Sequence, residues 1–412
     1  MELQSSQSPD FQKSFDLKQI EFQAVLDLTI AINKNQPEQG LYVILENYLL
    51  EKFGISHFSL FFKDEVWRNS FSYGKVIQSS ESISLLENLV QVSLLSEISE
   101  EFANENQHLH HVIPFFFDRE LRGVVLAGKL GEFSYPYDVE AVALIQTLLS
   151  LMVMALENQK LLAYRLRQEA FRKEIEIARQ VQRMLFPKTL PDTDALNIYT
   201  TYMPHQDVSG DYYDYIELSD KQFALCVADV SGKGMPAALL MSNFQACLRT
   251  LMMEKKEIGE AVQLVNTLLC INSNQERFIT SFIAIFDREK QHITYVNSGH
   301  NPPCLIYKDG SLVQMTQGST ILGIFPILPH LTIGQIPWTT EVLFVAYTDG
   351  LTEVVGEDDE EYGNQRLEQY FIENRNEKLP IMHQRFLNRL TEFSAEKGFN
   401  DDITLLTANI RP

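Results

Sequence analysis

Hydrophobic and polar positions follow different periods along the chain, and these periods predict its first elements. Apolar residues recur at helical spacing over 21–33 and again over 40–53. Residues 55–62 alternate like a strand, and residues 112–127 predict two strands around a charged turn. Residues 137–156 return to helical spacing, with apolar residues over much of the helix surface.

Two helices, several strands and a returning helix make up a predicted first domain, residues 16–157, after a tail at 1–15 that we expect to be disordered. This order resembles a GAF-type sensor domain, with a PAS-like or an unrelated α/β module as the alternatives. The resemblance implies a pocket for a small ligand, although no residue identifies that ligand. His108, His110 and His111 gather in a predicted loop, and we interpret them as solvated rather than as metal ligands.

A long helical pattern runs from Tyr137 to about Phe186, and Pro187 stops it. Within it, residues 158–190 predict a coiled-coil-like linker. The spacing favours a homodimeric coiled coil that passes a signal between domains, and the alternative is a simple spacer helix. The positions of the predicted seam fall into two groups with a register slip between them: Leu148, Leu151, Ala155, Asn158 and Leu162, then Phe171, Ile175, Ala178, Gln182 and Leu185.

The stretch around Asp229 predicts a strand, a tight turn and a helix in succession. Residues 223–228 form an apolar run typical of a buried strand, which places the Asp229 carboxylate at its end. Gly232 and Gly234 permit a tight turn, and Pro236 suits the first turn of a helix, where its missing N–H would have had no partner. The helix then carries apolar residues at helical spacing: Ala237, Leu240, Met241, Phe244 and Leu248.

Three further acidic positions repeat this placement of a carboxylate beside a strand. Asp211 leads into an alternating strand, Asp349 follows a buried one, and Asp401 opens the last one. Because a sheet aligns its strand ends, the four carboxylates can converge, and their repulsion would be costly without a cation. Two hard divalent cations about 3.5–4 Å apart relieve that cost, share a water and convert it to a hydroxide that can attack phosphorus.

Six motifs, in order along the chain, and the helical segment before them resemble those of the SpoIIE-like branch of the PPM superfamily. The members of this branch are metal-dependent serine/threonine protein phosphatases of bacterial signalling. The resemblance covers about residues 174–412. It implies an α-β-β-α sandwich over 191–412, and hence an α+β chain in which a long helix joins two domains. The matching motifs are GDYYD (210–214), VADVSGKGMPAAL (227–239), NSGHNPP (297–303), LGI (322–324), YTDGLTE (347–353) and NDDITLL (400–406), after AxxVQRMLFP ending at Pro187.

The matching motifs imply that the domain binds two metal ions. The ions are Mn²⁺ or Mg²⁺, and the sequence does not distinguish between them. The four aspartates would act catalytically through the metal-bound hydroxide. Asp402 is a further metal candidate, either as a ligand or as a residue that supports the ligands. The implied ligands are the backbone carbonyl of Val230, where relatives often have glycine, and the carboxylates of Asp211, Asp229, Asp349 and Asp401.

Composition limits the partners and the compartment. The 412 residues carry a net charge of −21, which argues against nucleic acid or an anionic membrane as the main partner. No stretch approaches the roughly 18 apolar residues of a membrane span, and the N-terminus does not resemble a signal sequence. The four cysteines are scattered without a metal-binding spacing. We therefore expect a cytoplasmic protein with free thiols.

Other conspicuous residues receive structural interpretations. Ser231 has no base at a recognisable spacing and is interpreted as a turn residue. His300 sits in a turn before two prolines, and Lys233 near the site is interpreted as solvated or paired rather than as a phosphate ligand. Residues 357–361 are read as a solvated acidic loop.

These observations predict a protein phosphatase that hydrolyses phosphoserine or phosphothreonine under control of the first domain. The resemblance implies that its substrate is a phosphorylated anti-sigma-factor antagonist with a STAS-type fold. We expect the helix at 174–190 to pack against residues 229–238 and so to govern metal occupancy. The alternatives are a catalytically degenerate regulator that binds phosphoproteins without turnover, and a metal-dependent hydrolase of small phosphate esters.

Overall fold

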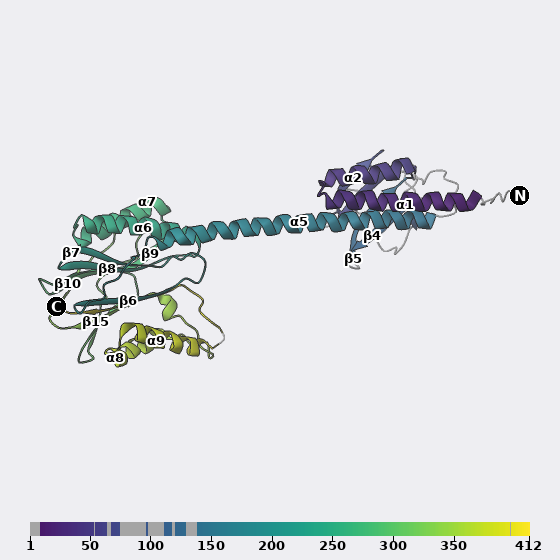
Figure 1. Ribbon diagram of the computed structural model, residues 1–412. Helices are drawn as coiled ribbons and strands as arrows, with labels where there is room; N and C mark the ends of the chain where they lie inside the picture. Colours follow the sequence, from purple (N-terminus) through teal and green to yellow (C-terminus); the bar gives the residue numbers. More distant parts are fainter. Residues whose placement is uncertain are drawn as a thin grey trace. The chain divides into compact units, whose positions relative to one another are not determined.

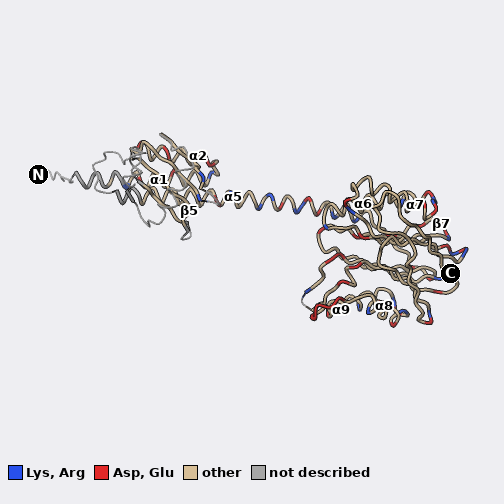
Figure 2. The backbone as a smooth tube through the Cα atoms, turned by 180° about the vertical axis from the view of Figure 1, so that it is seen from behind, with Lys and Arg blue, Asp and Glu red and all other residues tan. Residues whose placement is uncertain are grey.

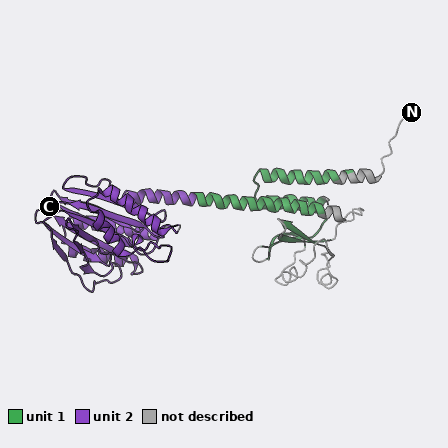
Figure 3. Ribbon diagram, turned by 90° about the horizontal axis from the view of Figure 1, so that it is seen from below, with its two compact units in different colours: residues 1–169 green, residues 170–412 purple. Residues whose placement is uncertain are grey.

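Figure 1 shows the computed structural model of the chain. Contacts divide the chain into two units, residues 1–169 and 170–412 (Figure 3). The division falls inside one long helix. The structure describes residues 9–52, 54–63, 67–74, 96–97, 111–117, 120–128, 138–395 and 397–412.

The first unit contains helices before and after an antiparallel sheet. Its strands lie in the order β2-β1-β5-β4-β3. Helix α1 begins at Pro9, within the stretch predicted to be disordered, while residues 1–8, His108 and His110 lie outside the described residues. The elements are α1 (Pro9–Asn33), α2 (Glu38–Asn47), the π-helical turn η1 (Tyr48–Lys52), β1 (Phe58–Lys63), β2 (Trp67–Tyr73), β3 (Ser96–Glu97), β4 (His111–Phe117), β5 (Glu120–Ala127) and the start of α5 (Asp138–Arg183).

The core of the first unit lies between its helices and one face of the sheet. Strand residues of one parity, such as Phe58 and Leu60 on β1, pack with Leu28 of α1 and Leu45 of α2. Leu148 of α5 joins the same cluster. The period-2 and helical patterns of the sequence therefore bury one face of each element against the other.

Helix α5 ends shortly before Pro187, as the sequence predicts. Leu148 and Leu151 of the predicted coiled-coil seam pack into the core of the first unit, and Gln182 is buried in the second. Leu162 and Phe171 of that seam remain 55% and 62% exposed. The residues at the two ends of the seam therefore pack against other parts of this chain. The middle of the seam is exposed to solvent, and Figure 2 shows residues of both charge signs along this part of α5.

The second unit is built on two mostly antiparallel sheets. One has the order β13-β10-β9-β8-β7 with β14 paired to β10, and the other has the order β12-β11-β15-β16-β6. The strands are β6 (Leu196–Met203), β7 (Tyr212–Ser219), β8 (Gln222–Val230), β9 (Ile279–Asp287), β10 (His292–Ser298), β11 (Cys304–Tyr307), β12 (Leu312–Gln314), β13 (Gly318–Ser319), β14 (Gly334–Pro337), β15 (Val342–Tyr347) and β16 (Ile403–Ile410).

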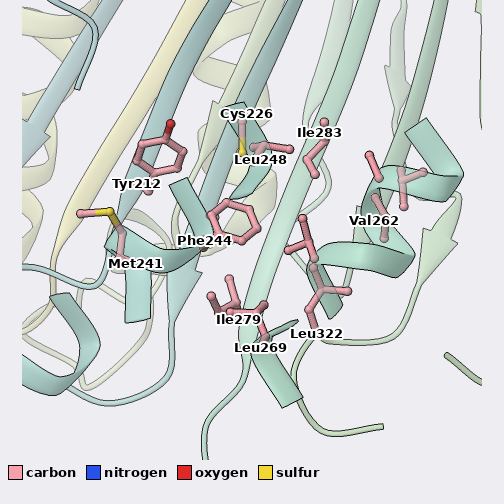
Figure 4. Packing of buried hydrophobic residues seen from close by; sticks show 14 of the residues in the cluster. Tyr212, Cys226, Met241, Phe244, Leu248, Val262, Leu269, Ile279, Ile283 and Leu322 are labelled. Atoms are coloured by element: carbon pink, nitrogen blue, oxygen red, sulfur yellow. The ribbon is translucent and has the colours of Figure 1, made fainter. Parts of the chain in front are cut away.

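Helices cover the outer faces of both sheets and produce the four-layer α-β-β-α sandwich that the sequence predicts (Figure 1). One hydrophobic cluster lies between α6, α7 and the first sheet, where Phe244 and Leu248 pack on Ile283 (Figure 4). A second lies between the sheets, and a third lies under α8 and α9. The helices are α6 (Met235–Met253), α7 (Ile258–Ser273), α8 (Gly363–Asn374) and α9 (Leu379–Ser394), with the 3-10 turn η2 (Asp349–Leu351).

Strand β8 shows why the sandwich needs continuous apolar runs. Cys226 and Ala228 face the α6 and α7 layer, and Leu225 and Val227 face the other sheet. Alternate side chains of a strand point to opposite faces, so a strand covered on both sides is apolar at every position. All four cysteines are free thiols, as predicted. Among the described helices, none combines the length and hydrophobicity required to cross a membrane.

A buried histidine links α9 to the second sheet. His383 is 1% exposed, and its ring nitrogens lie 2.7 Å from the hydroxyls of Thr201 and Thr407. Burial lowers the pKa of His383 to about 3. The unfolded chain takes up this proton near pH 6.5, whereas the folded chain does not, so stability is complete above pH 6.5 and is lost as pH falls below it.

We expect acidification to destabilise the second unit through His383. Between pH 7 and pH 5 this residue should cost about 2 kcal/mol of unfolding free energy. His383→Gln should remove one proton from the pH dependence of thermal unfolding, and the matched change at exposed His330 should leave that dependence as it is. Equal slopes for the wild type and His383→Gln would contradict the assignment.

Candidate metal centre

Two of the four predicted aspartates come from neighbouring strands of the first sheet. Asp211 immediately precedes β7, and Asp229 lies near the end of β8. Tyr212 pairs with Ala228 in this antiparallel ladder, so the start of β7 lies beside the end of β8. The turn after β8 has φ +90° at Gly232 and +73° at Gly234, and Pro236 stands in the first turn of α6.

The other two aspartates come from the second sheet. Asp349 opens η2 directly after β15, and Asp401 precedes β16. Tyr347 pairs with Leu405, so these two strand ends are also neighbours. A Cβ atom at Gly350 would lie 2.0 Å from the carbonyl oxygen of Asp402, so glycine is required where these loops meet.

Two threonines of the second sheet hold Asp211 of the first. Its Oδ2 accepts hydrogen bonds from Thr348 Oγ1 at 2.8 Å and from Thr404 Oγ1 at 2.5 Å. Thr404 N in turn donates to Thr348 Oγ1 at 3.0 Å. These bonds cross between the sheets, so the structure brings aspartates of both sheets to one end of the sandwich, as the sequence predicts.

The carboxylates repel one another where they meet. Burial, then the charge of Asp229, raises the pKa of Asp211 well above its usual range. Burial, then the charges of Asp349 and Asp401, raises the pKa of Asp229 to about 7. The pKa of Asp349 is also raised, first by burial and then by Asp401. Raised values of this kind mark charges that lack a compensating cation.

Both carboxylate oxygens of Asp402 accept hydrogen bonds from residues 205–210, the loop before β7. Its Oδ1 accepts a hydrogen bond from His205 N at 2.7 Å. Its Oδ2 accepts one from Ser209 Oγ at 2.6 Å and one from Gly210 N at 3.2 Å. Of the two roles left open for Asp402, these bonds favour support of the ligands over direct metal binding.

The Val230 carbonyl lies against the Asp211 segment. A Cβ atom at Gly210 would be 2.9 Å from Val230 O and 3.3 Å from the Cβ of Ala237. Glycine at position 210 therefore lets the strand that carries Asp211 approach the turn after β8. This contact places the carbonyl predicted as a ligand next to the residue that precedes Asp211.

A lysine partly neutralises the acidic group. Lys233 Nζ lies 2.9 Å from Asp401 Oδ2 and donates to the carbonyl of Asn400 at 2.9 Å. Both side chains are partly exposed, so the pair contributes little to stability. The predicted paired state of Lys233 is the one observed.

The donor set fits hard divalent cations, although it is not pre-assembled. Among the described residues, no three Asp, Glu, His or Cys side chains stand at the separations of a ready metal cage. The donors are all oxygen atoms, and burial followed by repulsion raises the pKa values of Asp211 and Asp229, a cost that a cation would relieve.

Ser231 and His300 have structural contacts. Ser231 Oγ accepts a hydrogen bond from Phe278 N at 2.9 Å, which fits its interpretation as a turn residue. His300 is 5% exposed, and its Nδ1 lies 2.9 Å from Thr280 Oγ1. Burial lowers the pKa of His300 to about 4, so a neutral imidazole packs in this turn.

Sequence reasoning assigned no role to Thr348, Thr404, Ser209 or the Gln182 side chain as supports of the site. Thr348 lies one residue before Asp349, and Thr404 lies three residues after Asp401, each in the same motif as its aspartate. A hydroxyl beside a predicted ligand was the available signal. Which carboxylate it would contact depended on how the sheets stack.

A two-sheet sandwich between helices, with aspartates of both sheets at one end, defines the second unit as a PPM-type phosphatase fold. Residues 219–411, within the second unit, match the family model described as Stage II sporulation protein E (SpoIIE). The SiaA-PP2C domain of Pseudomonas aeruginosa has the same fold, with a TM-score of 0.53 and 20% identity over 60% of this chain and 98% of that one.

Two curated relatives are similar over part of their length. Protein IcfG of Synechocystis is 27% identical over 287 residues, which are 62% of this chain and 44% of that protein. Phosphoserine phosphatase RsbU of Bacillus subtilis is 31% identical over 188 residues, which are 45% of this chain and 55% of RsbU. The chain thus spans about half the length of the curated relatives it matches.

Proposed function

We propose that this chain is a Mn²⁺- or Mg²⁺-dependent phosphatase of phosphoserine or phosphothreonine in proteins. The observation that carries the proposal is the group of aspartates that two sheets bring to one end of a SpoIIE-type domain, where burial and then mutual repulsion raise the pKa values of Asp211 and Asp229. The similarity to a phosphoserine phosphatase supports the same reaction class.

Each aspartate has a distinct part in this proposal. Asp211 is oriented because two threonines hold its Oδ2, which leaves Oδ1 for a cation. Asp229, Asp349, Asp401 and the Val230 carbonyl supply the remaining oxygens, and Asp402 fixes the loop before Asp211. The bound cations would supply charge neutralisation and an activated water for in-line attack on phosphorus. In an acidic chain they also create the local positive charge that a phosphate needs.

The proposed substrate is a phosphorylated anti-sigma-factor antagonist with a STAS-type fold. The resemblance of the six motifs to phosphatases of bacterial signalling supports this class. The net charge of −21 makes recognition of a nucleic acid or an anionic membrane unfavourable.

The first unit is proposed as a GAF-like sensor that controls the phosphatase. Its antiparallel sheet and covering helices support a sensor module, and a groove of about 600 Å³ lined by Tyr42, Phe71 and Arg68 offers room for a small ligand. Exposed apolar residues of α5, including Leu162, Leu166 and Phe171, support a homodimer. The dimer would bury them in a coiled coil.

Metal removal tests the activity. The purified chain with Mn²⁺ should release phosphate from a phosphoserine STAS-type protein, and EDTA should reduce release to background. Restoring Mn²⁺ should recover it, because the cation supplies the reactive water. Phosphoprotein binding without phosphate release would favour the degenerate regulator. Faster hydrolysis of nucleotides than of phosphoproteins would favour the small-ester hydrolase.

A further inference from the structure

A tight turn directly after β10 is held by the side chain of Asn297, which is 5% exposed. Asn297 Oδ1 accepts a hydrogen bond from His300 N at 2.8 Å, and Asn297 Nδ2 donates to His300 O at 3.0 Å. Gly299 within the turn has φ +68°, and a Cβ atom there would lie 2.6 Å from Cγ2 of Ile321. These contacts fix the backbone from which the His300 side chain leaves the turn.

The His300 side chain reaches the strand that is paired with Asp229. Its Nδ1 lies 2.9 Å from Thr280 Oγ1, and Thr280 of β9 is the ladder partner of Asp229 on β8. Burial lowers the pKa of the ring to about 4, and the backbone of Tyr347 opposes this lowering. Tyr347 is the last residue of β15 and stands two residues before Asp349. The ring therefore lies between a strand of the first sheet and a strand of the second.

The next residue of the turn reaches the loop that carries Asp349. Asn301 Nδ2 donates a long hydrogen bond of 3.4 Å to Thr352 Oγ1. Thr352 Oγ1 donates to the carbonyl of Asp349 at 3.1 Å, and Thr352 N donates to the same carbonyl at 2.8 Å. His300 and Asn301 thus connect one rigid turn to the neighbours of two aspartates, one in each sheet.

Burial of an imidazole at this position has a cost in stability. His300 is 5% exposed, and its Nε2 has no partner in hydrogen-bonding geometry among the described residues. A buried polar atom without a partner destabilises the folded chain, whereas an apolar ring of similar size would avoid that cost. A purely structural role therefore does not account for a histidine in this turn.

Resting on the proposed function, we infer that His300 is a positioning residue that sets the distance between Asp229 and Asp349. Strand pairing fixes an aspartate within its own sheet, but it leaves the separation of the two sheets open. The His300 ring, bonded to Thr280 and beside Tyr347, acts as a spacer between the sheets. Because Mg²⁺ requires nearly ideal octahedral geometry, a small change in this separation would weaken its binding to oxygens of both sheets.

The test measures Mn²⁺ binding to the full chain by calorimetry, beside thermal unfolding in EDTA. His300→Gln removes the ring and should raise the Mn²⁺ Kd by about 10- to 100-fold, the usual cost of losing a residue that orients metal ligands. His383→Gln is the matched control, because His383 is also a buried histidine beside threonine hydroxyls. Both variants should lower the Tm, and only His300→Gln should change the Kd.

A second variant covers the case in which His300→Gln does not fold. Asn301 is only partly buried, and Asn301→Ala loosens the same turn from the Asp349 loop by removing the bond to Thr352. Its Mn²⁺ Kd should rise by about three- to tenfold, less than for His300→Gln because that bond is long. In that case an unchanged Kd for Asn301→Ala would overturn the inference.

The outcomes separate the two proposals. A wild type that binds Mn²⁺ and hydrolyses p-nitrophenyl phosphate, beside a folded His300→Gln variant with an unchanged Kd, would overturn the role of His300 and leave the phosphatase in place. Equal rises in Kd for His300→Gln and His383→Gln would show a general loosening of the fold and would also overturn that role. A wild type that neither binds Mn²⁺ nor hydrolyses phosphate would overturn both proposals.

Discussion

Asp229→Asn should reduce Mn²⁺-dependent turnover by more than about 100-fold and, at the same time, stabilise the metal-free chain. Loss of residues that only orient metal ligands already costs about 10- to 100-fold, so loss of a ligand should cost more. The stabilisation follows from the pKa of Asp229, which burial and then Asp349 and Asp401 raise to about 7. Phosphate release and thermal unfolding in EDTA measure the two effects.

The pH dependence of this stabilisation has a defined sign. A carboxyl whose pKa is raised on folding costs nothing below its unfolded value near 4 and destabilises the folded chain as pH rises towards 7. The variant should therefore match the wild type near pH 4 and exceed it by on the order of 1–2 kcal/mol at pH 8.

Asp220→Asn is the matched control, since Asp220 is an exposed aspartate in the turn between β7 and β8. It should change neither activity nor stability. Undiminished turnover by Asp229→Asn would reject the metal centre. A metal-free Tm at pH 8 equal to that of the wild type would reject the repulsion among the aspartates.

Arg249→Met should destabilise the second unit by about 3 kcal/mol. Arg249 of α6 holds both oxygens of Asp214 on β7 at 2.7 Å, and Tyr212 also donates to Asp214 Oδ2. Asp214 is fully buried, so removal of the arginine leaves a buried carboxylate without its counter-charge. Breaking such a pair typically costs about 3–5 kcal/mol.

Scanning calorimetry of the full chain measures this loss in the transition of the second unit. Lys221→Met is the control, because Lys221 and Glu289 form an exposed pair 2.9 Å apart, which contributes little to stability. Equal losses for the two variants would show that the Asp214 pair does not join α6 to the first sheet. The second Asp of the GDYYD motif would then lack its proposed structural role.

Local patterns predicted much of the fold. The run 223–228, with glycines at 232 and 234 and Pro236, predicted β8, its turn and α6, because each depends on backbone preferences and on side-chain periodicity. The four aspartates were predicted to meet because strand ends align within a sheet. In each sheet the pairing brings two of them together.

The coiled-coil pattern did not determine what packs against α5, because the same apolar spacing can pack against different surfaces. Leu148 and Leu151 pack within the first unit, and Gln182 binds the loop before β7, although the same spacing predicts a dimer seam. Helical spacing identifies the face of a helix that is buried and leaves open what covers it.

The sequence by itself determined the strands, the turns and the acidic residues of this protein, because these follow from the chemistry of neighbouring residues. Only the tertiary structure decided which side chains contact one another around the site. Thr348 and Thr404 donate hydrogen bonds to Asp211. Asp402 accepts a hydrogen bond from Ser209, and Gln182 donates one to the carbonyl of the same residue. These contacts join residues 27 to 193 positions apart, and their geometry depends on how two sheets and a helix end pack together.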